Sequence, residues 1–146
     1  MIVELFIERV DWEIAQESCD RKNGWLVTIN SSIENKLVFN MAWMRDKRYT
    51  AWIGLNALKK QGDFRWIEFA DQETNLSKPV YTKWGRGEPN KLRTEKCTEM
   101  NRLAEWNNFP CQSISSRNPK YVCQYEIEQS LPCAVNNLSA SECNKM

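Results

Sequence analysis

The sequence predicts an α+β domain, in which two helices precede a mostly antiparallel sheet that carries one large loop. Two segments near the N-terminus place apolar residues at helical spacing, and the segments after them are short, β-rich runs. No third amphipathic helix follows the second one. Residues 1–126 form the predicted domain, and residues 127–146 form a polar C-terminal extension.

The first helix is expected to begin after Asp11, whose carboxylate can accept the free amide groups of a first turn. Trp12, Ala15 and Cys19 follow at helical spacing. Asn23-Gly24 then supplies residues that tolerate the positive φ of a helix end. The pattern therefore predicts one short helix with a buried face.

A second helix is indicated by Ser31 and Glu34, which have the spacing of a capping box. Leu37, Met41 and Met44 are the apolar face predicted for this helix. The strands are predicted from short β-rich runs at residues 25–29, 50–55, 64–67, 97–100, 103–106 and 121–125.

A long segment without regular structure lies between two of these strands. Residues 68–96 contain two prolines and two glycines but few aliphatic residues. In a compact domain, a loop of this length indicates either a functional segment or a wrong assignment of elements.

Composition excludes several classes of function. The chain has 146 residues, a net charge of +1 and no histidine. The missing histidine excludes Ser-His-Asp and Cys-His catalysis and His-ligated zinc sites. The near-neutral charge gives no electrostatic signature for nucleic acid, and no apolar run approaches the roughly 20 residues of a membrane span. We therefore expect neither a nucleic-acid partner nor membrane insertion.

The cysteines indicate an oxidising compartment. There are six, and none of them forms a C-x-x-C pair, so a disulfide framework is the better interpretation than a metal knuckle. Three N-x-[ST] sequons, at Asn30, Asn75 and Asn137, agree with a secreted or extracellular glycoprotein, although such short motifs also arise by chance. The apolar N-terminal stretch is too short for a signal-peptide core, so a leader is expected to be missing.

Oxygen-bearing side chains are concentrated at the end of the long loop and just after it. Glu88, Asn90, Glu95, Asn107 and Asn108 supply carboxylate and carboxamide oxygens, and calcium takes six to eight such ligands in irregular geometry. A cis bond between Glu88 and the following proline would direct the two flanking side chains to one point. Glu-Pro-Asn alone favours a solvated turn, and it is the spacing of the remaining donors that indicates calcium.

Three groups of residues together resemble the C-type lectin-like domain family over residues 10–126. These are Trp52-Ile53-Gly54-Leu55, the order of the first four cysteines, and Glu88-Pro89-Asn90 followed by Glu95-Lys96-Cys97 and Trp106-Asn107-Asn108. The resemblance implies that family's fold, with two helices, antiparallel sheets and a long calcium-binding loop. It also implies a strand before the first helix, for which Leu5-Phe6-Ile7 is the candidate.

The resemblance further implies two disulfides, Cys19–Cys123 and Cys97–Cys111. Cys133 and Cys143 lie beyond the matched region. A local disulfide between them is the first interpretation. An interchain bridge is the alternative, and it would make the protein a covalent homo-oligomer.

In the family, one calcium ion in the long loop binds two vicinal sugar hydroxyls. The resemblance assigns the ion to Glu88, Asn90, Glu95, Asn107 and Asn108, and the sugar to the first four of these. Glu-Pro-Asn is the family's variant for equatorial 3- and 4-hydroxyls, whereas Gln-Pro-Asp is the variant for galactose. We therefore expect a calcium-dependent lectin for mannose-type glycans, that is mannose, glucose, N-acetylglucosamine or fucose.

Two departures from the family pattern affect calcium. Asn108 stands where the family usually has aspartate, which leaves Glu88 and Glu95 as the only charged ligands and lowers the expected affinity. Alternatively, Asn108 caps its own loop and the calcium site is extinct. Lys91 and Lys96 occupy positions of an auxiliary calcium site, which their ammonium groups would repel.

Other conspicuous residues have structural interpretations. Trp66, Trp84 and Trp106 are expected to be core residues beneath the loop rather than sugar-stacking platforms. Lys59-Lys60 and residues 45–48 are expected to be solvated, although the second group could contact an acidic glycan or sulfate.

The predicted function is therefore glycan recognition at cell or microbial surfaces, as in innate immunity, without catalysis. A calcium-independent protein-recognition module on the same fold is the alternative, supported by Asn108. A hydrolase built on Glu88 and Glu95 is disfavoured, because a glycosidase needs one carboxyl group with a raised pKa in an apolar pocket.

Overall fold

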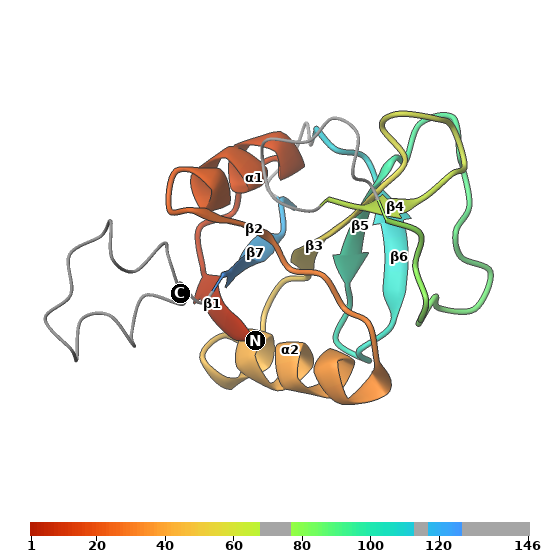
Figure 1. Ribbon diagram of the computed structural model, residues 1–146. Coiled ribbons are helices and arrows are strands. Elements are labelled where there is room, and N and C mark those ends of the chain that lie inside the picture. The colour runs from red at the N-terminus through yellow and green to blue at the C-terminus, as the bar shows by residue number, and fades with distance from the viewer. Residues whose placement is uncertain (68–76, 113–116, 127–146) are drawn as a thin grey trace, which may run out of the picture.

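A computed structural model of the chain describes residues 1–67, 77–112 and 117–126. Two helices pack against one seven-stranded sheet. Helix α2 (Ser32–Met44) runs along one side of it, and residues 77–96 of the long loop lie at the opposite end of the sheet from β1 (Ile2–Phe6) (Figure 1). The C-terminal extension, Cys133, Cys143 and the sequons at Asn75 and Asn137 lie outside the described residues.

Helix α1 covers Trp12–Asp20, as predicted, and buries Trp12, Ala15 and Cys19. Asp11 is its N-cap residue in extended backbone, but the Asp11 side chain makes no cap hydrogen bond, so the predicted reason for the helix start is wrong. Instead, Trp12 Nε1 in the first turn donates a hydrogen bond to the carbonyl oxygen of Ile53 at 2.9 Å. At the other end Asn23 takes the positive φ, 60°, which a C-terminal turn requires.

Helix α2 covers Ser32–Met44, and its N-cap behaves nearly as predicted. Ser31 Oγ accepts the amide hydrogen of Glu34 at 3.1 Å. The Glu34 carboxylate accepts in return from the backbone N–H of Asn30 at 2.7 Å, one residue earlier than in a standard capping box.

The buried face predicted for α2 is wrong. Leu37 and Met44 are 56% and 81% exposed, and Met41 is only partly buried. The buried residues are Asn35, Val38, Ala42 and Trp43. Apolar side chains occur on all sides of this helix, so periodicity alone does not select a face. Packing against β1 and β7 (Lys120–Tyr125) decides it.

The sheet has the order β1-β7-β3-β5-β6, with β2 added to β7 and β4 added to β3. Its strands are β1 Ile2–Phe6, β2 Gly24–Leu26, β3 Ala51–Asn56, β4 Arg65–Trp66, β5 Cys97–Met100, β6 Trp106–Phe109 and β7 Lys120–Tyr125. All pairings are antiparallel except that of β3 with β7, where Ala51 and Trp52 lie beside Lys120 and Tyr121.

Three strands differ from the prediction or complete it. β1 pairs with β7 over its whole length, so the strand before the first helix is present. β2 ends at Leu26, although Val27 and Ile29 beyond it are fully buried. β6 begins at Trp106, whereas the sequence indicated 103–106, because residues 101–105 form the turn that joins β5 to β6.

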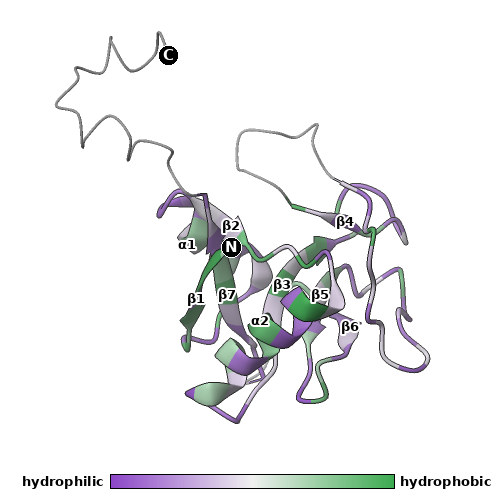
Figure 2. Cartoon of the chain, turned by 60° about the horizontal axis from the view of Figure 1, so that its bottom comes forward, coloured by the Kyte–Doolittle hydropathy of each residue, from purple (hydrophilic) through white to green (hydrophobic). Residues whose placement is uncertain are grey.

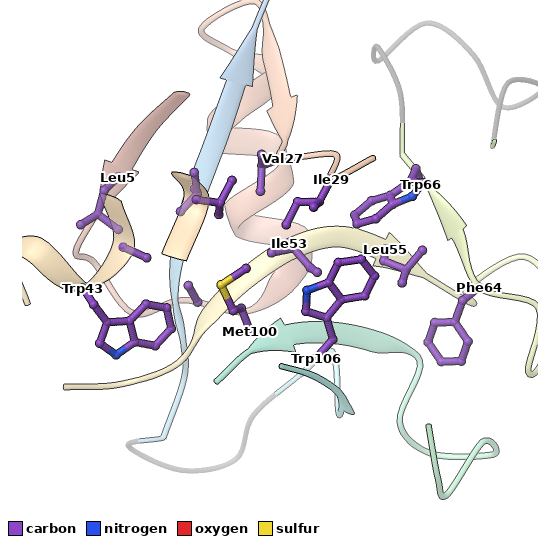
Figure 3. Packing of buried hydrophobic residues seen from close by; sticks show 14 of the residues in the cluster. Leu5, Val27, Ile29, Trp43, Ile53, Leu55, Phe64, Trp66, Met100 and Trp106 are labelled. Carbon is purple, nitrogen blue, oxygen red and sulfur yellow. The ribbon is translucent and has the colours of Figure 1, made fainter. Parts of the chain in front are cut away.

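The larger core cluster combines residues of α2 with residues of the sheet, and Tyr81 and Trp84 of the long loop pack against it. Figure 3 shows its side chains from Leu5 and Trp43 at one end to Trp66 and Phe64 at the other. Trp66 and Trp106 are both fully buried and meet edge to face, with ring centroids 5.4 Å apart. Figure 2 shows both hydrophobic and hydrophilic residues along α2. Gly54 in β3 allows close packing, because a Cβ atom there would lie 2.6 Å from the carbonyl oxygen of Leu26.

Two disulfides confirm the pairings that the resemblance implied. Cys19–Cys123 joins α1 to β7 and spans 104 residues, and Cys97–Cys111 joins β5 to the segment after β6 and spans 14. Within the described ranges, no helix is both long enough and apolar enough to cross a membrane.

Candidate calcium and sugar site

The end of the long loop is attached to the strands that carry the other predicted ligands. Gly85 N–H donates to the carbonyl oxygen of Trp106 at 2.8 Å, and Trp106 N–H donates to that of Lys83 at 2.7 Å. The Glu88-Pro89 peptide bond is cis. These bonds hold residues 88–95 beside the β5–β6 pair, in which Asn107 and Asn108 lie.

Glu88 and Asn90 flank the proline and contact each other directly. Asn90 Nδ2 donates to Glu88 Oε1 at 3.0 Å. The second carboxylate oxygen of Glu88, Oε2, is buried and has no hydrogen-bond partner among the described residues. A buried carboxylate oxygen without a partner is costly, and a cation would satisfy it.

The Asn108 side chain is buried and is bonded to the backbone of the loop. Its Oδ1 accepts from the N–H of Asn90 at 2.9 Å. Its Nδ2 donates to the carbonyl oxygen of Glu95 at 2.8 Å and also to that of Asn90. This amide therefore closes the loop with three hydrogen bonds, which is the capping role that the sequence left open for it.

Asn107 is oriented by an acidic residue that sequence reasoning missed. Asn107 Nδ2 donates to Glu99 Oε1 at 2.6 Å, from the position directly opposite on β5. Glu99 is 5% exposed, and its other carboxylate oxygen accepts from Thr50 Oγ1 at 2.5 Å. The signal in the sequence was a carboxylate within the otherwise non-acidic strand Cys97–Met100.

Burial and repulsion between neighbouring carboxylates raise the pKa of two acids in this region, Glu95 and Glu99. Burial raises the pKa of Glu95, and the nearby Glu88 carboxylate raises it further, against an opposing effect of Lys91. Lys91 Nζ lies 3.9 Å from Glu95 Oε1. Burial also raises the pKa of Glu99, and the charges of Glu95 and Glu88 contribute in the same direction. An added cation would relieve this repulsion.

The five predicted ligands therefore lie in one region, but their side chains do not all contact one another. Glu88 contacts Asn90, and Asn108 links the backbone of Asn90 to that of Glu95, whereas Asn107 bonds Glu99 and, at 3.4 Å, Asn101. Across the described ranges, no three His, Cys, Asp or Glu residues cluster in a way that could hold a metal. Carboxamides therefore have to complete any calcium site here.

These residues fit calcium in part. The carboxylates of Glu88 and Glu95, the first with an unpartnered oxygen, and the side-chain oxygens of Asn90 and Asn107 match the chemistry that calcium takes. The Asn107 oxygen also accepts from Asn101, at 3.4 Å. The Asn108 side-chain oxygen, by contrast, is already occupied by the N–H of Asn90.

The tryptophans near the loop are structural, as predicted. Trp66 and Trp106 are fully buried, and Trp106 Nε1 donates to Asn35 Oδ1 on α2 at 2.9 Å. Trp84 is partly buried and packs edge to face on Phe64 and Trp106. Outside this region, Asn30, Lys59 and Lys60 lie at the surface.

Comparison with known proteins establishes the family. The family model described as "Lectin C-type domain" matches residues 8–125, so the chain belongs to the C-type lectin domain family. Members of this family are typically binding modules rather than enzymes.

Two curated relatives show the extent of the similarity. The chain is 33% identical over 116 residues to a perlucin-like protein of Mytilus galloprovincialis, covering 77% of this chain and 69% of the relative. It is 28% identical over 127 residues to the hepatic lectin of Gallus gallus, covering 86% of this chain and 53% of that protein. The chain thus spans about half to two-thirds of the length of these relatives.

Solved structures share the fold. The C-type lectin CEL-I of Cucumaria echinata superposes with a TM-score of 0.71 at 28% identity, covering 85% of this chain and 90% of that one. The cow CD23 carbohydrate-recognition domain, solved in the presence of GlcNAc2Man3 oligosaccharide, gives 0.68 at 27% identity, covering 86% and 88%. A calcium-independent type II antifreeze protein gives 0.69 at 22% identity, covering 86% of each chain, which shows the fold alone.

Proposed function

We propose that this domain binds mannose-type sugars through a calcium ion at the end of its long loop. One observation carries the proposal: Glu88 and Asn90 form an adjacent acid–amide pair, and one buried oxygen of Glu88 has no partner among the described residues. Glu88, Asn90, Glu95 and Asn107 would hold the ion, together with the main-chain oxygen of Asn108. When bound, the ion supplies positive charge that polarises two vicinal hydroxyls of the sugar.

The pair also explains a preference between sugars. The Glu88 carboxylate can only accept from a hydroxyl, whereas the Asn90 amide can donate to one. In the described structure that amide donates to Glu88 itself, so it is already oriented toward the space between the two side chains. This order of acceptor and donor is the one expected for equatorial 3- and 4-hydroxyls, and the related CD23 domain was solved with a mannose-containing oligosaccharide.

The proposed setting is extracellular, because both described disulfides persist only in an oxidising compartment. Recognition of glycans on cell or microbial surfaces is the role that fits a secreted sugar-binding domain of this family. Occupancy of the exposed sequon at Asn30 can be checked by mass before and after glycosidase treatment.

A second candidate function rests on Asn108. Its three hydrogen bonds close the loop with groups of the protein alone, which would leave a stable surface for protein recognition without calcium. The two candidates differ in one measurement. Chelation with EDTA abolishes sugar binding in the first and leaves ligand binding unchanged in the second.

The decisive experiment exchanges the pair, Glu88→Gln with Asn90→Asp, and measures competitive elution from mannose and galactose beads in calcium. We expect mannose retention to fall and galactose retention to rise, because donor and acceptor change places. The control Glu17→Gln with Asn40→Asp makes the same change of charge at exposed helix positions and should elute like the wild type. Unchanged elution of the first variant would refute the assignment of these two residues.

A further inference from the structure

The turn after α2 lies at the end of that helix away from the long loop (Figure 1). This turn borders a cavity of about 640 Å³. It is lined by Leu5 and Ile7 on one side and by the turn after α2 on the other, which contributes Arg45, Asp46, Lys47 and Arg48. The volume is within the range of roughly 300–1,000 Å³ that small-molecule sites occupy. The function proposed above does not use this cavity.

The charge of the lining is strongly asymmetric. Three cationic side chains line the cavity against one acid, and that acid is already paired: Arg48 Nε lies 3.1 Å from Asp46 Oδ1. The Asp46 side chain is only 12% exposed, whereas the Arg48 side chain is 75% exposed. Within the parts of the chain that the structure describes, neither Arg45 nor Lys47 has an ion-pair partner.

The turn that presents these cations is held by a buried ammonium group. Lys120 on β7 is fully buried, and its Nζ donates to the carbonyl oxygens of Asp46, at 2.5 Å, and Arg48, at 3.1 Å. The same ammonium lies 4.4 Å from the centre of the Trp43 ring. Its positive charge lies behind the turn and adds to the field at the cavity.

The Tyr49 ring at the end of the turn contacts two arginine side chains. Tyr49 has a φ of 59°, and the Arg9 guanidinium lies over its ring at 4.1 Å from the centroid. Arg48 lies 5.5 Å from the same centroid. The cationic groups are therefore attached to an ordered frame instead of extending from a free loop, which lowers the entropic cost of binding.

We propose that this cavity binds sulfate groups of a sulfated polysaccharide, independently of calcium. Arg45, Lys47 and Arg48 supply the cations, and Ile7, which is 60% exposed, supplies an apolar surface for a sugar ring. A concave site with an apolar wall suits a sugar chain better than a flat anionic membrane. Guanidinium groups also bind tetrahedral oxyanions through two parallel hydrogen bonds.

The test measures binding of the full chain to a heparin hexasaccharide by calorimetry in EDTA, so that the proposed calcium site makes no contribution. We expect wild-type binding that weakens with salt, and no binding to the fully desulfated hexasaccharide. The double variant Arg45→Gln/Lys47→Gln, which leaves the Asp46–Arg48 pair intact, should lose about tenfold in affinity, and adding Arg48→Gln should reduce it further.

The matched control is Arg21→Gln/Lys36→Gln/Arg102→Gln, which removes three exposed cations outside the cavity. It should bind within about twofold of the wild type. Equal losses in the control and cavity triple variants would overturn the proposal in favour of a general charge effect, as would absence of wild-type binding. Binding to vesicles of anionic phospholipid but not to heparin would overturn it in favour of a membrane surface. Near-UV circular dichroism of each variant verifies that it is folded.

Discussion

Replacing Asn108 with aspartate separates the two roles that this position can have. In the wild type, the Asn108 amide donates to the carbonyl oxygens of Asn90 and Glu95. An aspartate carboxylate can donate to neither. The new charge would also stand near Glu95, whose pKa burial already raises. Without calcium the variant should therefore be less stable, whereas with calcium it gains a third charged ligand.

The expected loss of stability without calcium follows from these bonds. Two lost hydrogen bonds of about 1 kcal/mol each lower the free energy of unfolding by about 2 kcal/mol. For a chain of this length, each kcal/mol shifts the melting temperature by about 2–4 °C, so the expected loss in EDTA is about 4–8 °C. The extra negative charge should tighten calcium binding by about tenfold. Calcium at 100 times its Kd then restores about 2.7 kcal/mol, which offsets the loss.

The assay is tryptophan fluorescence, followed during thermal unfolding in EDTA and during calcium titration at 25 °C. Asn108→Ala is the first control, because it loses these two bonds, and also the one accepted from the Asn90 N–H, without gaining a ligand. It should be destabilised in EDTA and poorly rescued by calcium. Asn40→Asp, on the exposed face of α2, is the control for added charge. A variant as stable as the wild type in EDTA, or one with unchanged calcium affinity, would refute the reasoning.

Two further predictions concern residues behind the loop. Burial holds the pKa of Glu99 above its ordinary value of 4.5, so wild-type stability from this group falls as pH rises from about 4.5 through the raised pKa. Glu99→Gln cannot ionise, and its stability relative to the wild type should therefore increase over the same pH window and then level off. Urea unfolding from pH 4 to 8 measures this, and parallel curves would contradict it. Asn35→Ala leaves Trp106 Nε1 and the Ala104 carbonyl oxygen without a partner at a 3% exposed site, which should cost about 2–4 kcal/mol. Leu37→Ala, at an exposed position of the same helix, should cost far less, and equal losses by urea unfolding would count against the role of Asn35.

The sequence predicted most of the fold because its signals are local. Ser31 and Glu34 are three residues apart, so the start of α2 depends on one turn of chain. The strand Ala51–Asn56 is apolar on both faces because helices and loops cover the sheet on both sides. The buried side of α2 was assigned wrongly, since Leu37 and Val38 are adjacent and equally apolar, and only contact with β1 and β7 distinguishes them.

The sequence indicated which residues could form the candidate site, but not which side chains contact each other there. Glu88, Asn90 and Glu95 could be named because they lie within eight residues of one another. Glu99 was not, because its role depends on lying opposite Asn107 across the β5–β6 pair, which is a matter of register. Similarly, Lys120 is 72 residues from Arg48 along the chain, and only the parallel pairing of β3 with β7 brings them together.

By itself, the sequence determined which elements form, which four cysteines pair through family resemblance, and which loop carries the oxygen donors, because these depend on short-range patterns or shared motifs. Only the tertiary structure decided what each side chain bonds to. Asn108 shows this most clearly. An amide at that position can ligate a metal or close a loop, and it closes the loop here because the carbonyl oxygens of Asn90 and Glu95 lie within reach of its two hydrogens.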